Sequence, residues 1–168
     1  RYSTEVRRML PALVRAEGPI HVEHALKRIN ASLRLKRSTA PFKEIFGGAV
    51  RDLARRGVLS VRGGFLWPEP PVELKVRVPV EGVKETFRPI EYIPPEEVRM
   101  AVTLIAGHSL GLRVESLLSE TARLLGFRRM GKRVRAALAE AYESLIREGV
   151  LVQREDRATL ADGSPVRR

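Results

Sequence analysis

Residues 36–67 read KRSTAPFKEIFGGAVRDLARRGVLSVRGGFLW. Apolar side chains between Phe42 and Leu53 recur at the spacing of a helix with one buried face. Gly57 is placed to end that helix in the left-handed conformation. Gly63-Gly64 then separates two short apolar runs, which favours a tight hairpin turn. The stretch therefore predicts a helix that is followed by a two-stranded hairpin.

Two further helices are expected before this stretch. Ser3 and Thr4 are candidate N-caps of the first helix, and Gly18-Pro19 is expected to stop it. A short extended piece, residues 20–22, separates it from the second helix. The apolar faces of these two helices are formed by Val6, Met9, Leu10, Leu13 and Val14, and by Ala25, Leu26, Ile29 and Leu33.

The same order of elements recurs in the second half of the chain. A helix is expected after Pro94-Pro95, with Glu96 and Glu97 favourable at its N-terminus. An extended piece, two more helices, the stop Gly149 and a hairpin follow. The sequence thus predicts a mainly α chain with small β-hairpins (α+β), built as two tandem winged-helix (helix-turn-helix) units. We expect unit 1 over residues 1–70, a Pro-rich linker over 71–95, unit 2 over 96–160 and a frayed tail over 161–168. Alternating residues between Val72 and Val80 predict a strand within the linker.

The charge of the chain is strongly basic and unevenly distributed. The 168 residues include 31 Lys and Arg against 20 Asp and Glu, a net charge of +11, and 25 of the 31 cations are Arg. The net charge is +8 over residues 1–70, zero over 71–95 and +3 over 96–168. Such an excess indicates a polyanionic partner, most often nucleic acid. The alternative is a solvated basic surface.

Several function classes are disfavoured by what the sequence lacks. It contains no Cys, which excludes disulfides, Cys-based zinc sites and thiol nucleophiles and fits a cytoplasmic protein. It has no apolar run long enough to span a membrane, and no GxxxxGK[ST] phosphate-binding loop. We therefore expect no cofactor, no membrane or small-molecule partner and no catalytic activity. The chain begins with Arg1 rather than Met, and we expect it to be a piece of a longer protein.

Four stretches carry a resemblance to a known family: AEGPIHVEHALKRI (16–29), GGFLW (63–67), IPPEEVRMAV (93–102) and SETARLLGFRRMGKRVRAAL (119–138). They resemble an uncharacterised domain at the C-terminal end of very large bacterial superfamily I helicases. Those helicases often also carry a Vsr-like or restriction-endonuclease-like domain. The resemblance covers nearly the whole chain and implies an accessory region of a DNA-processing enzyme.

Two acid-free basic runs fall where the predicted fold would meet DNA. Residues 27–43 and 123–135 each hold six basic side chains and no acidic one. In a helix-turn-helix unit, the third helix enters the major groove and the turn before it meets phosphate. The residues expected to bind DNA, including the wing residue Arg62, are Arg34, Lys36, Arg37, Lys43, Arg62, Arg128, Arg129, Lys132, Arg133 and Arg135.

Other motifs have a structural and a functional interpretation. Phe65 and Trp67 suit the core, although aromatic side chains also stack on bases. His21 and His24 lack a third metal ligand. Asp52 with Glu73-Leu74-Lys75 matches the loose pattern of metal-dependent nucleases, which gather such groups around a metal ion.

The sequence thus predicts a non-catalytic module that binds duplex or fork DNA with weak sequence specificity. The first alternative is docking to another protein or to the helicase itself, and the remote alternative is a metal-dependent nuclease.

Overall fold

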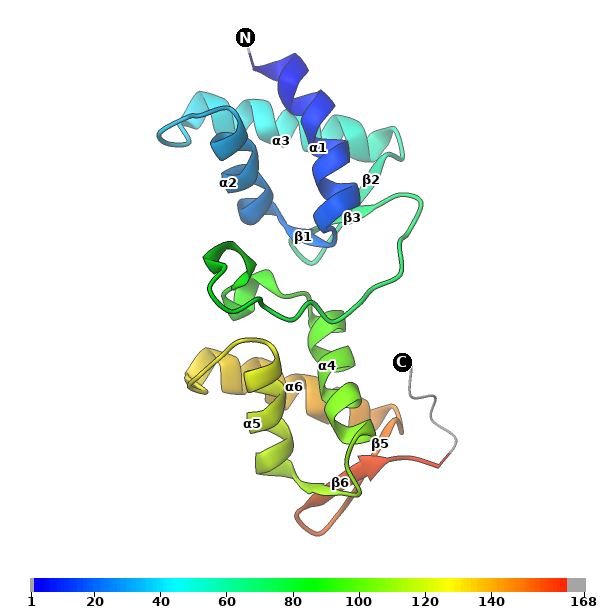
Figure 1. Cartoon of the computed structure of the whole chain (residues 1–168). Coiled ribbons are helices and arrows are strands. Elements are labelled where there is room, and N and C mark those ends of the chain that lie inside the picture. Colours follow the sequence, from blue (N-terminus) through cyan, green and yellow to red (C-terminus); the bar gives the residue numbers. More distant parts are fainter. Residues whose placement is uncertain (1, 163–168) are drawn as a thin grey trace. The chain divides into compact units, whose positions relative to one another are not determined.

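The computed structural model describes residues 2–162. The chain divides into two compact units, the first ending at Leu74 and the second beginning at Lys75. The described part is a mixed α+β structure with six α-helices and two small antiparallel sheets (Figure 1). The predicted class, mainly helical with small hairpins, is confirmed. Of the tail predicted to fray, residues 163–168 lie outside the described residues.

Unit 1 contains three helices and a three-stranded sheet. Its elements are α1 (Ser3–Glu17), β1 (Ile20–His21), α2 (Val22–Ser32), α3 (Ala40–Arg55), β2 (Leu59–Arg62) and β3 (Phe65–Pro68). The strand order is β1-β3-β2, and Arg62 pairs with Phe65 across the two-residue turn. Gly63 and Gly64 both have positive φ, 56° and 81°, as a hairpin turn of two residues requires. The predicted hairpin is confirmed.

Unit 2 repeats this order after two short 3-10 helices. Its elements are η1 (Lys84–Thr86), η2 (Ile90–Tyr92), α4 (Pro95–Gly107), β4 (Leu112–Arg113), α5 (Val114–Leu124), α6 (Lys132–Arg147), β5 (Leu151–Arg154) and β6 (Arg157–Leu160). The strand order is β4-β6-β5. Every helix and strand of unit 1 has a counterpart that begins 92 residues later, as with Ala40 and Lys132 or Leu59 and Leu151. The repeat therefore has no insertion or deletion between these starting points.

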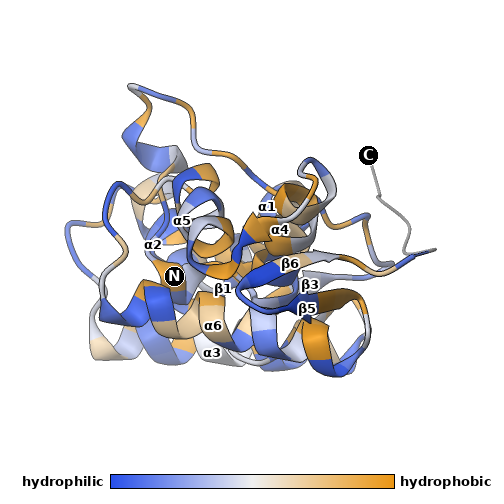
Figure 2. Cartoon of the chain, turned by 90° about the horizontal axis from the view of Figure 1, so that it is seen from below, coloured by the Kyte–Doolittle hydropathy of each residue, from blue (hydrophilic) through white to orange (hydrophobic). Residues whose placement is uncertain are grey.

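Each unit has its own apolar core beneath its sheet. The core of unit 1 is formed by Val6, Leu10, Val14, Ile20, Ala25, Ile29, Phe42, Phe46, Ala49, Val50, Leu53, Leu59 and Leu66. The amphipathic character of the helices is visible in Figure 2, where the helices carry both orange and blue segments. Gly57 and Gly149 follow α3 and α6 with φ of 68° and 71° and turn the chain into the hairpins, as predicted.

The predicted strand over residues 72–80 does not form, since residues 69–83 contain neither helix nor strand. Two backbone N–H groups that a ladder would use are taken by side chains. Arg77 donates its backbone N–H to Glu97 Oε1 at 2.9 Å, and Val80 donates its own to Thr86 Oγ1 at 2.8 Å. Pro79 has no N–H to donate. The alternation therefore reflects a chain packed irregularly, with Val76 against the core of unit 2.

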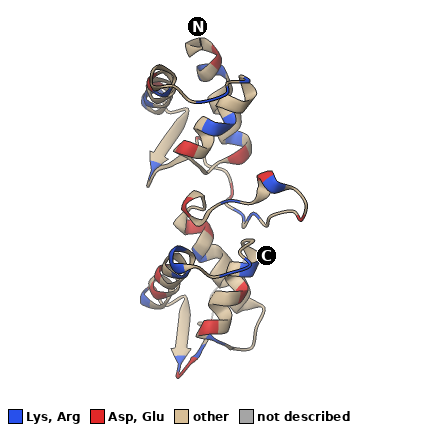
Figure 3. Ribbon diagram, turned by 90° about the vertical axis from the view of Figure 1, so that its left-hand side faces the viewer, with Lys and Arg blue, Asp and Glu red and all other residues tan. Residues whose placement is uncertain are grey.

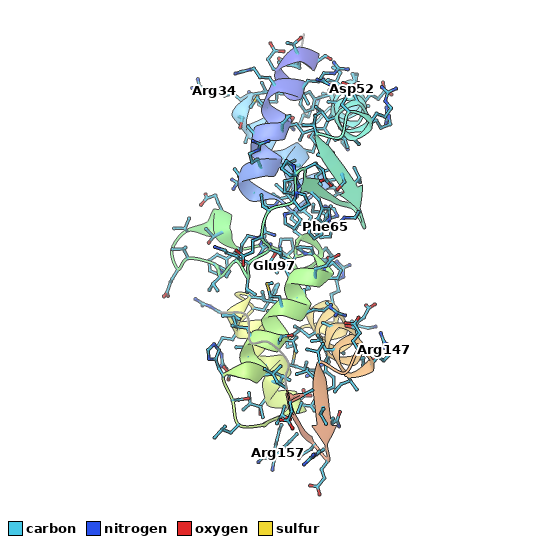
Figure 4. All side chains as sticks on the ribbon, turned by 90° about the vertical axis from the view of Figure 1, so that its right-hand side faces the viewer. Arg34, Asp52, Phe65, Glu97, Arg147 and Arg157 are labelled. Atoms are coloured by element: carbon cyan, nitrogen blue, oxygen red, sulfur yellow. The ribbon has the colours of Figure 1, made fainter. Side chains whose placement is uncertain are left out.

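A buried ion-pair cluster fixes this segment to α4. The side chain of Glu97 is fully buried and accepts hydrogen bonds from the guanidinium groups of Arg77 and Arg88 (2.6 and 2.7 Å; Figure 4). The sequence had suggested only a favourable charge at the helix N-terminus. Burial raises the pKa of Glu97, but the hydrogen bonds and charges of Arg88 and Arg77 outweigh burial and lower the pKa overall.

The expected N-caps of α1 differ from the structure. The helix already includes Ser3, and the residue before it, Tyr2, makes no side-chain capping bond. Ser3 Oγ instead accepts a hydrogen bond from Arg7 within the helix. Among residues 2–162, no helix has both the length and the apolar composition needed to cross a membrane.

Candidate nucleic-acid interface

The two basic turns occupy the same place in the two units. Residues 33–39 join α2 to α3, and residues 125–131 join α5 to α6. Lys36 and Arg37 lie in the first turn, and Arg128 and Arg129 lie 92 residues later in the second. All four are exposed, and no ion pair or side-chain hydrogen bond engages them in the described part of the chain. Figure 3 shows blue segments on both turns.

Unit 1 holds its turn with polar contacts. Leu35 donates its backbone N–H to the carbonyl of Asn30 at 3.0 Å, and Asn30 Nδ2 donates to Ser38 Oγ. Thr39 then caps α3, because its Oγ1 accepts a hydrogen bond from the N–H of Phe42 at 3.4 Å. Lys36 and Arg37 are thus presented from a turn that is fixed on both sides.

Unit 2 keeps the same backbone hydrogen bond at its turn, but Ala122 and Met130 stand where unit 1 has Asn30 and Ser38. Phe127 donates its N–H to the carbonyl of Ala122 at 2.9 Å, and the side chains of Phe127 and Met130 pack against the core. Phe127 is thus half-buried. Gly131 occupies the N-cap of α6 and supplies no side-chain acceptor, so the first amides of α6 are not capped by a side chain.

Arg34 has a strained backbone at the start of the turn. Its φ is 54°, and its counterpart in unit 2 is Gly126, with φ of 94°. The left-handed region is unfavourable for a residue with a Cβ atom and is easily adopted by glycine. Unit 1 thus has an exposed cation where the backbone favours glycine (Figure 4).

Acidic side chains reach part of the second basic run from other elements. Arg133 pairs with Glu91 at 2.9 Å, and Arg135 pairs with Glu115 at 2.6 Å. The pKa of Glu91 is lowered, first by a backbone hydrogen bond and then by Arg133. Lys43 at the start of α3 and Lys132 at the start of α6 are exposed and have no such partner among residues 2–162. The basic run 123–135, which contains no acid in sequence, is therefore partly ion-paired with acidic residues of other elements.

The arginine side chains of the two hairpins contact different groups. Arg62 is exposed at the end of β2, with its guanidinium 4.1 Å from the centre of the Trp67 ring. Phe65 is buried and makes an edge contact with His21, with ring centres 5.2 Å apart. In unit 2, Arg157 donates to the carbonyl of Gly111 at 2.8 Å. Arg62 is therefore held against an aromatic ring in unit 1, and Arg157 against the backbone in unit 2.

Sequence reasoning missed Arg51, which lies two helical turns after Lys43 on α3. Arg51 is exposed, and its side chain has no ion pair in the described chain. Its guanidinium lies over two glycines, since a Cβ added at Gly47 would be 3.4 Å from one of its nitrogens. The spacing 43, 47, 51 along the polar face of the helix could have indicated it.

Two residues of the remaining motifs, His21 and Asp52, make structural contacts. His21 Nδ1 accepts a hydrogen bond from the N–H of Glu23 and caps α2. Asp52 pairs with Arg7, Arg55 and Arg56 at 3.5, 3.3 and 3.9 Å. Across residues 2–162, no group of three or more His, Asp or Glu side chains is arranged to hold a metal ion.

Comparison of the chain with family models, with curated proteins and with solved structures finds no match.

Proposed function

We propose that the chain is a DNA-binding module made of two winged-helix units, which grips duplex or fork DNA through its two basic turns and catalyses no reaction itself. In this proposal, α3 and α6 are the helices presented to DNA, and β2-β3 and β5-β6 are the wings. The order of three helices and a three-stranded sheet supports it in each unit. The resemblance to helicase-associated domains suggests a larger DNA-processing protein around it.

The observation that carries the proposal is the pair of unpartnered cations that occurs twice. Lys36 and Arg37 in one turn, and Arg128 and Arg129 in the other, are 92 residues apart and have no side-chain partner among the described residues. No ion pair or hydrogen bond within the described residues accounts for these exposed side chains. A polyanionic ligand would supply the missing partners.

The mechanism is electrostatic capture. Each cation that meets a phosphate releases condensed counter-ions, so binding weakens with salt at a slope of about −0.9 per contact. Four contacts from the two turns give a slope of about −3.6. Affinity should then fall by about 150-fold between 50 and 200 mM salt. Arg34, Lys43 and Lys132 would add to this slope.

The test is a salt series of fluorescence anisotropy on labelled duplex, fork and single-stranded DNA. The variants Lys36→Ala/Arg37→Ala and Arg128→Ala/Arg129→Ala should each reduce the slope by about 1.8 and weaken binding alike on all sequences. The matched control is Arg8→Ala/Arg15→Ala, which removes the same charge from exposed positions of α1. Binding that is absent, independent of salt or equally affected by the control would refute the proposal.

A protein-docking function is the second candidate, and it rests on a different surface. Val78, Val80 and Phe87 expose 54%, 55% and 46% of their surface on the loop before η2. Clustered exposed apolar side chains are typical of protein contacts. In that case Val78→Ser/Val80→Ser would abolish association with a helicase polypeptide and leave DNA affinity unchanged.

A further inference from the structure

The two units present different surfaces on their third helices, and this difference can be compared position by position. On α3, the face opposite the core carries Lys43, Glu44, Gly47, Gly48 and Arg51. On α6, the positions 92 residues later are Arg135, Ala136, Ala139, Glu140 and Glu143. From these faces we propose that unit 1 reads base edges of duplex DNA through α3, whereas unit 2 holds the phosphate backbone only. The inference rests on the proposed function and assigns a separate task to each unit.

The outer face of α3 carries two cations with two glycines between them. Lys43 and Arg51 are exposed, and neither has an ion pair in the part of the chain that is described. Eight residues separate them, which is about 12 Å along the helix axis. That distance spans about three to four base pairs. Gly47 and Gly48 between them project no side chain, and the guanidinium of Arg51 lies over both, so a base edge that approaches this face would meet Arg51.

The outer face of α6 carries acids at the same points. Glu140 and Glu143 stand where α3 has Gly48 and Arg51; both are exposed, and neither has a cationic partner among residues 2–162. Arg135, the counterpart of Lys43, is already paired with Glu115. Two unpaired carboxylates facing a phosphate backbone would oppose insertion of α6 into a groove.

The fold does not require this difference. The buried stripes of the two helices match in position, as with Phe46 and Leu138 or Leu53 and Leu145. Both turns also keep their exposed cation pair. The two units therefore share their buried helix positions and the turn cations that would contact phosphate. They differ on the helix surface that would face the bases.

The chemistry of α3 indicates the kind of site. Arg51 is suited to bidentate hydrogen bonds with guanine in the major groove, and Lys43 also favours guanine. Glu44 is suited to accept a hydrogen bond from cytosine N4. The ligand of unit 1 is thus a duplex with a G·C-containing segment of three to four base pairs.

Reciprocal charge exchange tests the inference. Gly48→Glu/Arg51→Glu gives α3 the charges of α6, and Glu140→Ala/Glu143→Arg removes the acids from α6. Each variant is measured by anisotropy on duplex DNA and by sequence enrichment from a randomised duplex library. The α3 variant should bind DNA at least about tenfold more weakly than the original chain and should enrich no sequence. The α6 variant should bind at least as tightly as the original chain and should enrich the same sequence.

The outcomes separate this inference from the proposed function. If the turn variant Lys36→Ala/Arg37→Ala weakens binding but the α3 variant does not, unit 1 does not read bases, while the proposed DNA binding stands. If the α3 variant keeps the enriched sequence, or the α6 variant loses it, the assignment of tasks is overturned. If the original chain shows no salt-dependent binding, the proposed function fails first. The fluorescence midpoint of Trp67, the single tryptophan, verifies that the α3 variant is folded.

Discussion

Replacing Glu97 by Gln should destabilise unit 2 and leave unit 1 unchanged. The Glu97 side chain is 0% exposed, and its two partners differ in their access to water: Arg88 is 9% exposed and Arg77 is 34% exposed. Breaking a buried pair by removing one partner costs about 3–5 kcal/mol, because a buried charge is left without compensation. Since Arg77 can turn towards solvent, we expect a cost of about 3 kcal/mol, at the lower end of that range.

The assay uses two probes on the whole chain. Unit 2 comprises residues 75–168, and a domain of this size loses about 4–8 °C of melting temperature per kcal/mol. The helices α4, α5 and α6 should therefore melt about 12–24 °C earlier in far-ultraviolet circular dichroism. Trp67 lies in unit 1, so its fluorescence midpoint should not move.

The matched control is Glu115→Gln, which breaks an ion pair whose members are both about half exposed. Such a pair contributes under about 1 kcal/mol, so the control should melt within a few degrees of the original chain. A Glu97→Gln chain that melts like the control, or a Trp67 midpoint that moves with unit 2, would refute the stabilising role assigned to the cluster.

Three further predictions follow from the same structure. The folded pKa of Glu97 lies below its ordinary value of 4.5. Its contribution to the free energy of unfolding is therefore complete above pH 4.5 and declines as the pH falls through the folded pKa. The stability of unit 2 should thus fall more steeply with acid in the original chain than in Glu97→Gln. Arg34→Gly relieves the left-handed strain and should raise the free energy of unfolding of unit 1 by up to about 1 kcal/mol, as measured by denaturation. The same variant should weaken DNA binding, as measured by anisotropy. Gly126→Ala should destabilise unit 2 by more than about 1 kcal/mol in urea unfolding, because the new Cβ would lie 2.7 Å from Pro79 Cγ at a φ of 94°; an unchanged midpoint would contradict the packing of residues 79–87 on this turn.

Local signals in the sequence were sufficient for the helices and hairpins. Apolar periodicity and the glycines at 57, 63, 64 and 149 act within a few residues, so their effect can be predicted without tertiary information. The repeat was visible for the same reason. The constant spacing of 92 residues needed the element boundaries, which periodicity defines only loosely.

Contacts between residues far apart in the sequence could not be predicted from such local signals. The alternation from Val72 to Val80 resembles a strand, but a strand forms only where a partner offers its backbone. Here Glu97, some 20 residues away from Arg77, takes the donor instead. The pairing of Arg133 with Glu91, 42 residues apart, likewise converts a run that is acid-free in sequence into one that is partly neutralised in space.

The candidate interface shows the same division between local and distant information. Lys36, Arg37, Arg128 and Arg129 were predicted from their place before a helix, and in the structure they are exposed and have no side-chain partner among the described residues. Arg51 was missed because it lies outside the two acid-free runs and next to Asp52. Only the outer face of α3 brings it into line with Lys43.

The internal repeat separates what the fold needs from what a ligand would need. Positions that pack, such as Leu59 and Leu151, are apolar in both units because each sheet must cover its own core. The turn cations also match in both units, although they are exposed and have no polar partner among the described residues, and the outer faces of α3 and α6 do not match. A solvated surface requires only that residues be polar, so it explains the mismatch on the helices but gives no reason for two adjacent cations at matching positions of two turns whose side-chain contacts differ. A phosphate-binding role gives that reason, because the turn before the third helix is where both units would meet the same backbone.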